Sequence, residues 1–234
     1  MSKLTIAAIS DLHGYLPEME EPADILLLAG DISPLEIQRD LVKMDKWVNT
    51  KFIKWIEQLP VKTVYFTPGN HDFYFERLDY SKLFNIIENC EHKLVYLDNK
   101  QDMFFKDNEE WTIFGTPYCH MFGRWPFMKY DDELTTLFKE IPETVDIIIT
   151  HDPPFNLGDS DLILGPAPFE ISKSHVGSIP LGSRLSNVNY KLCVCGHIHT
   201  GDHNYNKEHN IVNVSYVDEY YSPRFPYFYK ILEK

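Results

Sequence analysis

Residues 4–13 read LTIAAISDLH, a short apolar run rich in β-branched residues that ends abruptly in Asp11 and His13. Such a run is typical of a strand that is buried on both faces of its sheet. Four more runs have the same form and also end at Gly, Asp, Asn or His, and they cover residues 25–29, 63–67, 145–150 and 192–195. We therefore expect five buried strands.

Helical patterns lie between these runs. Residues 35–59 carry apolar side chains at three- and four-residue spacing and are followed by Pro60, which predicts an amphipathic helix, and residues 80–89 and 131–140 predict two more. Strands that alternate with helices indicate βαβ units and a largely parallel or mixed sheet. Shorter strand candidates suggest a second sheet layer: 94–97, 103–105, 111–115, 211–214 and 227–231. The predicted fold class is α/β, with a two-sheet β-sandwich flanked by helices rather than a simple doubly wound sheet.

Length and composition favour one globular domain over residues 1–234. The chain has 234 residues, of which 44% are hydrophobic, so it can bury a substantial core. Residues 153–189 are rich in Gly, Pro and Ser and lack periodicity. A loop of that length inside a compact domain is usually functional, so we expect it to border the site.

The charge balance and the cysteines bear on partners and location. The formal net charge is −13 without a basic cluster, which disfavours duplex nucleic acid as a partner. Cys90, Cys119, Cys193 and Cys195 form no C-x-x-C pair and are expected to be free thiols. The apolar run 4–9 meets Asp11 too soon for a signal peptide or a membrane span. We therefore expect a reduced cytoplasmic protein without a membrane partner.

Side chains that can bind metal follow all five predicted strands. Since ligands bind at the carboxyl ends of the strands in an open α/β sheet, these residues should converge on one crevice. They comprise two carboxylates, one amide and four imidazoles: Asp11, His13, Asp31, Asn70, His151, His197 and His199. These are more ligands than one ion can bind while leaving room for substrate. Two metal ions are therefore expected, with Asp31 able to bridge them. Oxygen and nitrogen ligands without thiolate favour Mn, Fe or Zn over Ca or Mg.

The order of these motifs, D-x-H, G-D, G-N-H-D, H and G-H-x-H, resembles the calcineurin-like metallophosphoesterase superfamily, and all five blocks lie between Asp11 and His199. The resemblance implies a four-layer α/β/β/α fold and a dinuclear-metal-dependent phosphoester hydrolase that attacks phosphorus with a metal-bridged hydroxide, with Mn favoured in vitro. It also implies one metal held by Asp11, His13, Asp31 and His199, and a second held by Asp31, Asn70, His151 and His197. Within this pattern His71 matches the histidine that contacts the substrate phosphate as general acid or transition-state stabiliser, so His71 and Asp31 are the catalytic candidates.

Finer features narrow the expected activity. The chain lacks the V-D-R-G and R-G-N-H-E blocks of the phosphoprotein phosphatases, and residues 114–118, 122–127 and 150–154 are similar to the small metallophosphoesterase-domain branch. We therefore expect a phosphodiesterase, rather than a monoesterase, that acts on small or nucleotide-like phosphoesters. The alternatives are a non-catalytic interaction scaffold of the same fold, or a DNA nuclease of the same superfamily. The native metal pair, the physiological substrate and the oligomeric state stay open.

Other polar and aromatic residues receive weaker predictions. Asp72 and Asp152 are expected to orient imidazoles rather than bind metal. Two interpretations of Arg124 and Trp125 are equally favoured: they bind a substrate phosphate and base, or they pack the loop onto the sheet. His175 lies in the long loop, from which it could reach the site. The aromatic segment 216–229 is expected to be structural. The same is expected of the remaining histidines, His92, His120, His203 and His209.

Overall fold

Two mixed five-stranded sheets form the centre of the structure, a computed structural model that describes residues 2–155 and 176–234. The first sheet has the order β12-β1-β2-β3-β4, with β1 to β4 parallel and β12 antiparallel to β1. Its strands are β1 (Lys3–Ile9), β2 (Ile25–Ala29), β3 (Thr63–Thr67), β4 (Lys93–Tyr96) and β12 (Phe228–Glu233). The predicted buried strands 4–10, 25–29 and 63–67 are thus confirmed as neighbours in one sheet.

The second sheet has the order β11-β10-β9-β6-β5, in which only β5 runs antiparallel to its neighbour. Its strands are β5 (Lys100–Lys106), β6 (Glu109–Thr116), β9 (Ile147–Thr150), β10 (Leu192–Cys195) and β11 (Ile211–Asn213). A short parallel pair, β7 (Cys119–His120) and β8 (Met128–Lys129), follows β6. The carboxyl ends of β9 and β10 belong to this sheet, so the predicted site draws on two sheets rather than on one.

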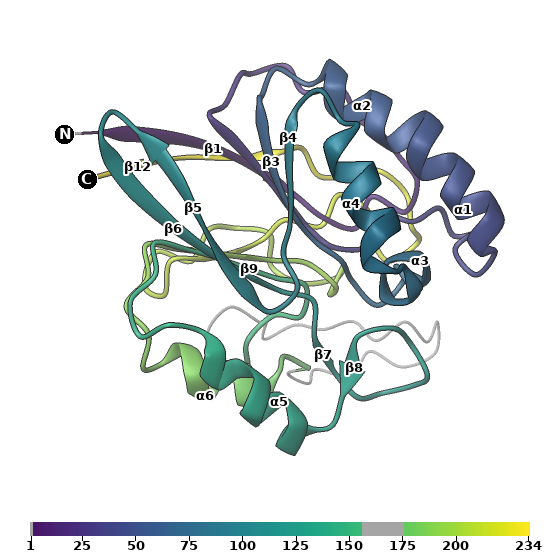
Figure 1. Cartoon of the computed structure of the whole chain (residues 1–234). Helices are drawn as coiled ribbons and strands as arrows, with labels where there is room; N and C mark the ends of the chain where they lie inside the picture. Colours follow the sequence, from purple (N-terminus) through teal and green to yellow (C-terminus); the bar gives the residue numbers. More distant parts are fainter. Residues whose placement is uncertain (1, 156–175) are drawn as a thin grey trace.

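Helices cover the outer face of each sheet, which confirms the predicted sandwich flanked by helices and gives the order α/β/β/α (Figure 1). The first sheet carries α1 (Leu41–Trp47), a π-helical turn (Val48–Phe52), α2 (Ile53–Gln58), α3 (Phe73–Arg77) and α4 (Tyr80–Glu88). The second sheet carries α5 (Asp131–Leu137), a 3-10 turn (Phe138–Glu140) and α6 (Ile179–Leu185).

The elements differ from the prediction in five places. The helix predicted over 35–59 begins at Leu41, because the Asp40 carboxylate accepts from the backbone N–H of Lys43 and caps it there. The strands predicted at 94–97 and 227–231 join the first sheet, not a second layer. Helix α3 was not predicted, and α6 lies inside the stretch 153–189 that was predicted to be a loop. His175 lies outside the described residues.

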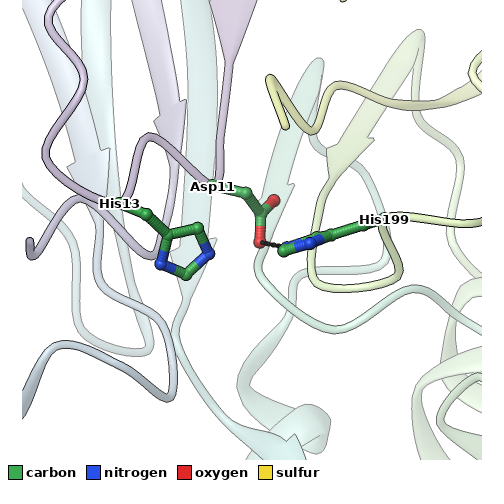
Figure 2. Close-up of side chains that lie close together, drawn as sticks. All are labelled: Asp11, His13 and His199. Carbon is green, nitrogen blue, oxygen red and sulfur yellow. Dashed lines mark hydrogen bonds and ion pairs between the residues drawn. The ribbon is translucent and has the colours of Figure 1, made fainter. Parts of the chain in front are cut away.

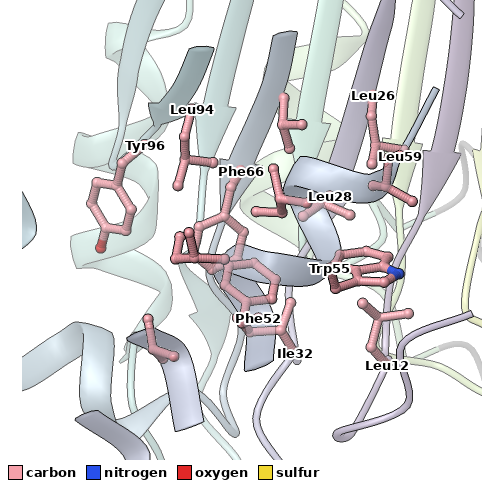
Figure 3. Packing of buried hydrophobic residues seen from close by; sticks show 14 of the residues in the cluster. Leu12, Leu26, Leu28, Ile32, Phe52, Trp55, Leu59, Phe66, Leu94 and Tyr96 are labelled. Atoms are coloured by element: carbon pink, nitrogen blue, oxygen red, sulfur yellow. The ribbon is translucent and has the colours of Figure 1, made fainter. Parts of the chain in front are cut away.

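The strands are apolar on both faces because each sheet packs against two layers. Ile6 and Ala8 of β1 face the other sheet and pack in a cluster with Trp111 and Ile149. The alternate positions of β1 face the helices, in a second cluster that holds Phe52, Trp55 and Phe66 (Figure 3). At about 25 cal/mol per Å² of apolar area removed from water, these buried layers are the main favourable term in folding.

Two further predictions concern the cysteines and membranes. None of the four cysteines forms a disulfide, and Cys193 and Cys195 are fully buried in one apolar cluster. Within residues 2–155 and 176–234, no helix combines the length and the apolar character that a membrane crossing requires.

Candidate metal centre

Five strand ends deliver their polar side chains to one place. Asp11 follows β1, Asp31 follows β2 and Asn70 follows β3, while His151 and His197 follow β9 and β10 of the second sheet. Asp31, His151 and His197 have ligand atoms that all lie within 4.8 Å of one another, although they come from different sheets. The structure therefore brings the predicted residues together, and their action as metal ligands stays a prediction.

The first group of donors is Asp11, His13 and His199, whose ligand atoms lie within 4.8 Å of one another (Figure 2). The Nε2 atom of His199 lies 3.1 Å from Oδ1 of Asp11. Its Nδ1 atom lies 3.1 Å from the backbone oxygen of Asp218. A second contact of this kind fixes the ring orientation and leaves Nε2 for the site.

The second group is Asp31, His151 and His197. Nε2 of His151 lies 3.3 Å from Oδ2 of Asp31 and 3.0 Å from the amide oxygen of Asn70. Its Nδ1 atom is held 2.8 Å from the backbone oxygen of Ala29. The carboxylate of Asp31 also belongs to a third group with His13 and His71. Asp31 therefore stands between the two ends of the centre, as a shared ligand must.

Burial and unmet hydrogen bonds show that these residues fit metal ions. Asp11 and Asp31 are 0% and 2% exposed. Both ring nitrogens of His13 are buried and have no hydrogen-bond partner among the described residues. Buried polar groups are normally satisfied, and buried carboxylates normally lie beside a cation. A pair of divalent ions would meet both requirements.

The protonation states of two proposed ligands, His13 and His197, agree with metal binding. Burial lowers the pKa of His13 to about 3, against the opposing carboxylates of Asp31 and Asp11. Burial, together with the charge of His151, also lowers the pKa of His197 to about 4. Both rings are therefore neutral at pH 7 and keep a lone pair for a metal. His151 differs, because the carboxylate of Asp31 outweighs burial and raises its pKa to about 10, so that it balances the Asp31 charge while no metal is bound.

Backbone strain is concentrated at the same residues. Asp11, His13, Asp31 and His197 all have positive φ, at 52°, 42°, 54° and 68°. Left-handed backbone at such positions is costly and persists where the surrounding structure enforces it, often at functional sites. Gly69 lies against Asp31 and His151, so that a Cβ atom at this position would collide with the Asp31 carboxylate and the His151 ring. The glycine therefore permits the close approach of the β3 loop.

Asp72 does not orient an imidazole, contrary to the prediction. Its fully buried carboxylate accepts hydrogen bonds from the backbone N–H groups of Asp31, Ser33 and Gly69, at 2.9, 3.1 and 2.8 Å, and from the hydroxyl of Ser33 at 2.6 Å. The side chain thus ties the loop after β2 to the loop after β3. It fixes the backbone on which Asp31 and Asn70 stand.

Asp152 does hold an imidazole, but it is that of His120, a residue expected to be structural. Oδ2 of Asp152 lies 2.7 Å from Nδ1 of His120, and the ring of His120 lies beside His197, with centroids 6.4 Å apart. The hydrogen bond and charge of Asp152 outweigh burial and raise the pKa of His120. A lone histidine in an aromatic loop gave no signal of this contact in the sequence.

His71, the predicted general acid, lies between two residues that set its ring. Its Nδ1 atom lies 2.8 Å from the amide oxygen of Gln38, and Trp125 packs on the ring at a centroid distance of 4.6 Å. The guanidinium above Trp125 belongs to Arg39, at 4.9 Å, whereas Arg124 is exposed. Trp125 thus packs against His71 and Arg39, and its contact with substrate stays a prediction. Gln38 and Arg39 were missed because nothing in their sequence context marked them.

Mn²⁺ should stabilise the protein by binding here. For a ligand that binds only the folded state, a concentration 100 times the Kd adds about 2.7 kcal/mol per site. In a chain of this size each kcal/mol shifts Tm by roughly 2–4 °C, so one filled site should raise Tm by about 5–10 °C. Scanning calorimetry of chelator-treated protein with and without Mn²⁺ measures this shift, and an unchanged Tm at saturating Mn²⁺ would contradict it.

Comparison with known proteins gives concordant matches. A family model described as calcineurin-like phosphoesterase matches residues 4–201. Metallophosphoesterase domain-containing protein 1 of Homo sapiens is 27% identical over 82% of this chain and 60% of that protein. Probable rhamnogalacturonate lyase C of Emericella nidulans is 29% identical over 87% of this chain but only 17% of that protein. The chain thus spans less than two thirds of the length of these relatives.

A solved structure shows the same fold. Phosphopantetheinyl hydrolase (PptH) from Mycobacterium tuberculosis superposes with a TM-score of 0.52 over 93% of this chain and 90% of that one, at 16% identity. At this identity the superposition concerns the arrangement of sheets and helices alone.

Proposed function

We propose that this chain, which belongs to the calcineurin-like phosphoesterase family and is therefore a metal-dependent phosphoesterase, hydrolyses small or nucleotide-like phosphodiesters with two metal ions. The observation that carries the proposal is the carboxylate of Asp31, which lies within ligand distance of donors at both ends of the centre. We further propose that residues 1–234 act as one domain in the cytoplasm, where cysteines without disulfides are ordinary.

The proposed ligand sets follow from the two groups of donors. Asp11, His13 and His199, with Asp31, would hold one ion, and His151, His197 and Asn70, with Asp31, would hold the other. Bound metal would supply Lewis-acid stabilisation of the charge on the phosphoryl group and a more acidic water as nucleophile. Manganese, iron or zinc suits this mixture of oxygen and nitrogen donors.

The residues of the chain contribute proton transfer and orientation. The Nδ1–H group of His71 donates a hydrogen bond to the amide oxygen of Gln38 at 2.8 Å, which leaves Nε2 available to the substrate. A protonated Nε2 can donate to the leaving oxygen as the ester bond breaks, the role of a general acid. Burial lowers the pKa of His71 against the opposing charge of Asp31, which makes its protonated form a stronger acid. Trp125 packs on the same ring and limits its rotation.

Two features support a diester over a phosphoprotein substrate. The chain lacks the V-D-R-G and R-G-N-H-E blocks of the phosphoprotein phosphatases. The ring of Trp125 is half-buried at the edge of the centre, and an indole offers a flat surface to a planar organic group. A diester places such a group on either side of the phosphorus.

Chelation should lower hydrolysis at least ten-fold, and Mn²⁺ should restore it. The substrate is bis-p-nitrophenyl phosphate, with p-nitrophenyl phosphate as the monoester comparison, and the measurement is the release of nitrophenolate after dialysis against chelator. The expected rates are higher for the diester than for the monoester. Activity that is indifferent to metal would contradict metal dependence, and a fully metal-loaded protein without turnover would favour the scaffold alternative. Mn²⁺-dependent cleavage of DNA alone would favour the nuclease.

A further inference from the structure

Tyr221 lies against the centre, although its segment was expected only to pack. The centroid of its ring is 4.8 Å from that of His13, 5.1 Å from that of His199 and 6.2 Å from that of His71. Its side chain is not covered, since 36% of the residue is exposed. Tyr221 is therefore partly exposed and packs beside two proposed ligands, His13 and His199, and near the proposed acid His71.

The backbone of Tyr221 is strained in the same way as the backbone of the proposed ligands. Apart from Gly, Asn and Asp, which tolerate left-handed backbone, positive φ occurs among the described residues at His13, Phe127, His197 and Tyr221. His13 and His197 are proposed ligands, and Phe127 is 6% exposed in the apolar core. Tyr221, at φ 59°, is held in a costly conformation without such burial.

A tight turn holds the tyrosine in place and links it to His199. The backbone N–H of Tyr221 donates to the backbone oxygen of Asp218 at 2.9 Å, and the same oxygen lies 3.1 Å from Nδ1 of His199. The Asp218 carboxylate accepts from the N–H groups of Tyr220 and Ser222, both at 3.0 Å. One turn thus orients a proposed ligand and places a phenol beside it.

Among the described residues, the hydroxyl of Tyr221 has no hydrogen-bond acceptor. It makes no hydrogen bond to any residue that the structure describes, whereas the nearby hydroxyls of Tyr15 and Tyr227 both donate to backbone oxygens. A phenol ordinarily titrates at about pH 10 and so carries its proton at neutral pH. A hydroxyl donor beside the proposed metal centre can donate a hydrogen bond to a charged oxygen of a phosphoryl group.

We propose that Tyr221 is a substrate-binding residue of this centre, whose hydroxyl donates a hydrogen bond to a non-bridging oxygen of the phosphoryl group. The inference rests on the proposed function and adds to it a contact that comes from the chain rather than from metal. The ring, packed on His13 and His199, sets the position from which the hydroxyl reaches the substrate.

The test compares Tyr221→Phe with the matched variant Tyr220→Phe, a neighbouring tyrosine that is 79% exposed. A hydrogen bond to a charged group contributes enough that its loss should lower kcat/KM about 10- to 100-fold for Tyr221→Phe. Inhibition by inorganic phosphate should weaken in the same variant, because phosphate presents the same oxygens. Tyr220→Phe should match the wild type in both measurements.

A calorimetric titration with Mn²⁺ separates substrate binding from support of the metal. Tyr221→Phe keeps the ring, so its affinity for Mn²⁺ should equal that of the wild type. Wild-type kcat/KM and phosphate inhibition in Tyr221→Phe would overturn the inference, as would a loss of Mn²⁺ affinity that accounts for the lost activity. A wild type that binds Mn²⁺ but hydrolyses no ester is the distinct failure of the proposed function, and phosphate binding then still tests the contact.

Discussion

Asp31→Asn should lower kcat about a thousand-fold while the metal-free protein remains folded. The carboxylate is 2% exposed and lies within reach of donors at both ends of the centre, with Nε2 of His151 at 3.3 Å and Nε2 of His13 at 3.9 Å. An amide has no charge with which to hold two cations. If about 4 kcal/mol of transition-state stabilisation depends on the metal pair, its loss corresponds to roughly three powers of ten in rate.

Stability should respond differently from activity. Oδ1 of Asp31 accepts a hydrogen bond from the backbone N–H of His71 at 2.7 Å, and an asparagine oxygen can accept it too. Without the Asp31 charge, burial favours the neutral form of His151, so the ring can release its proton and leave no unpaired charge in the interior. The metal-free Tm should therefore stay within a few degrees of the wild type. Calorimetric titration should show weaker Mn²⁺ binding.

Asp132→Asn is the matched control, since Asp132 is exposed on α5. It should retain wild-type turnover and Mn²⁺ affinity. Near-normal turnover in Asp31→Asn would be incompatible with a shared carboxylate ligand.

The sequence predicted the strands well because their burial is nearly complete. The runs at 25–29, 63–67 and 192–195 match β2, β3 and β10 residue for residue. Pairing was harder to predict, since β4 and β12 lie in the first sheet and β9 and β10 in the second. Apolar character indicates that a strand is covered on both faces, but it does not indicate which strand it pairs with. Helix α6 was missed because it has only seven residues and contains Pro180 and Gly182, two residue types with low helix propensity.

The positions of the proposed ligands were predictable for a related reason. Metal-competent residues at strand ends must share an edge once the strands are parallel, and two sheets meeting at that edge serve as well as one. No comparable rule predicts where side chains on loops will lie. Tyr221 depends on a turn that only the folded Asp218 segment creates, and the partner of Asp152 is His120 because the β6 loop returns to it.

Asp72 shows a limit of motif reasoning. An aspartate next to an active-site histidine was expected to orient an imidazole, yet its carboxylate points into the loops and accepts from three backbone N–H groups and one hydroxyl. Backbone donors carry no residue identity, so the sequence does not reveal them as partners. The consequence is that Asp72 should matter more to folding than to chemistry.

Asp72→Ala should destabilise the metal-free protein by about 3–5 kcal/mol, because it leaves the N–H groups of Asp31, Ser33 and Gly69 without their acceptor in a fully buried place. In a chain of this size the expected fall in Tm is roughly 6–20 °C. Thermal unfolding in chelator, followed by circular dichroism, measures it. Turnover at a temperature where the variant is folded should fall far less than in Asp31→Asn.

Asp40→Ala is the matched comparison, because Asp40 also accepts a backbone hydrogen bond, from Lys43 at 3.1 Å, but does so at the exposed start of α1. Losing a helix cap of this kind costs about 1 kcal/mol, since water can satisfy the freed N–H. The two aspartates thus differ in burial and in the number of donors, and the difference in free energy of unfolding isolates those factors. Equal destabilisation by the two variants would mean that the buried Asp72 network does not join the loops that carry Asp31 and Asn70.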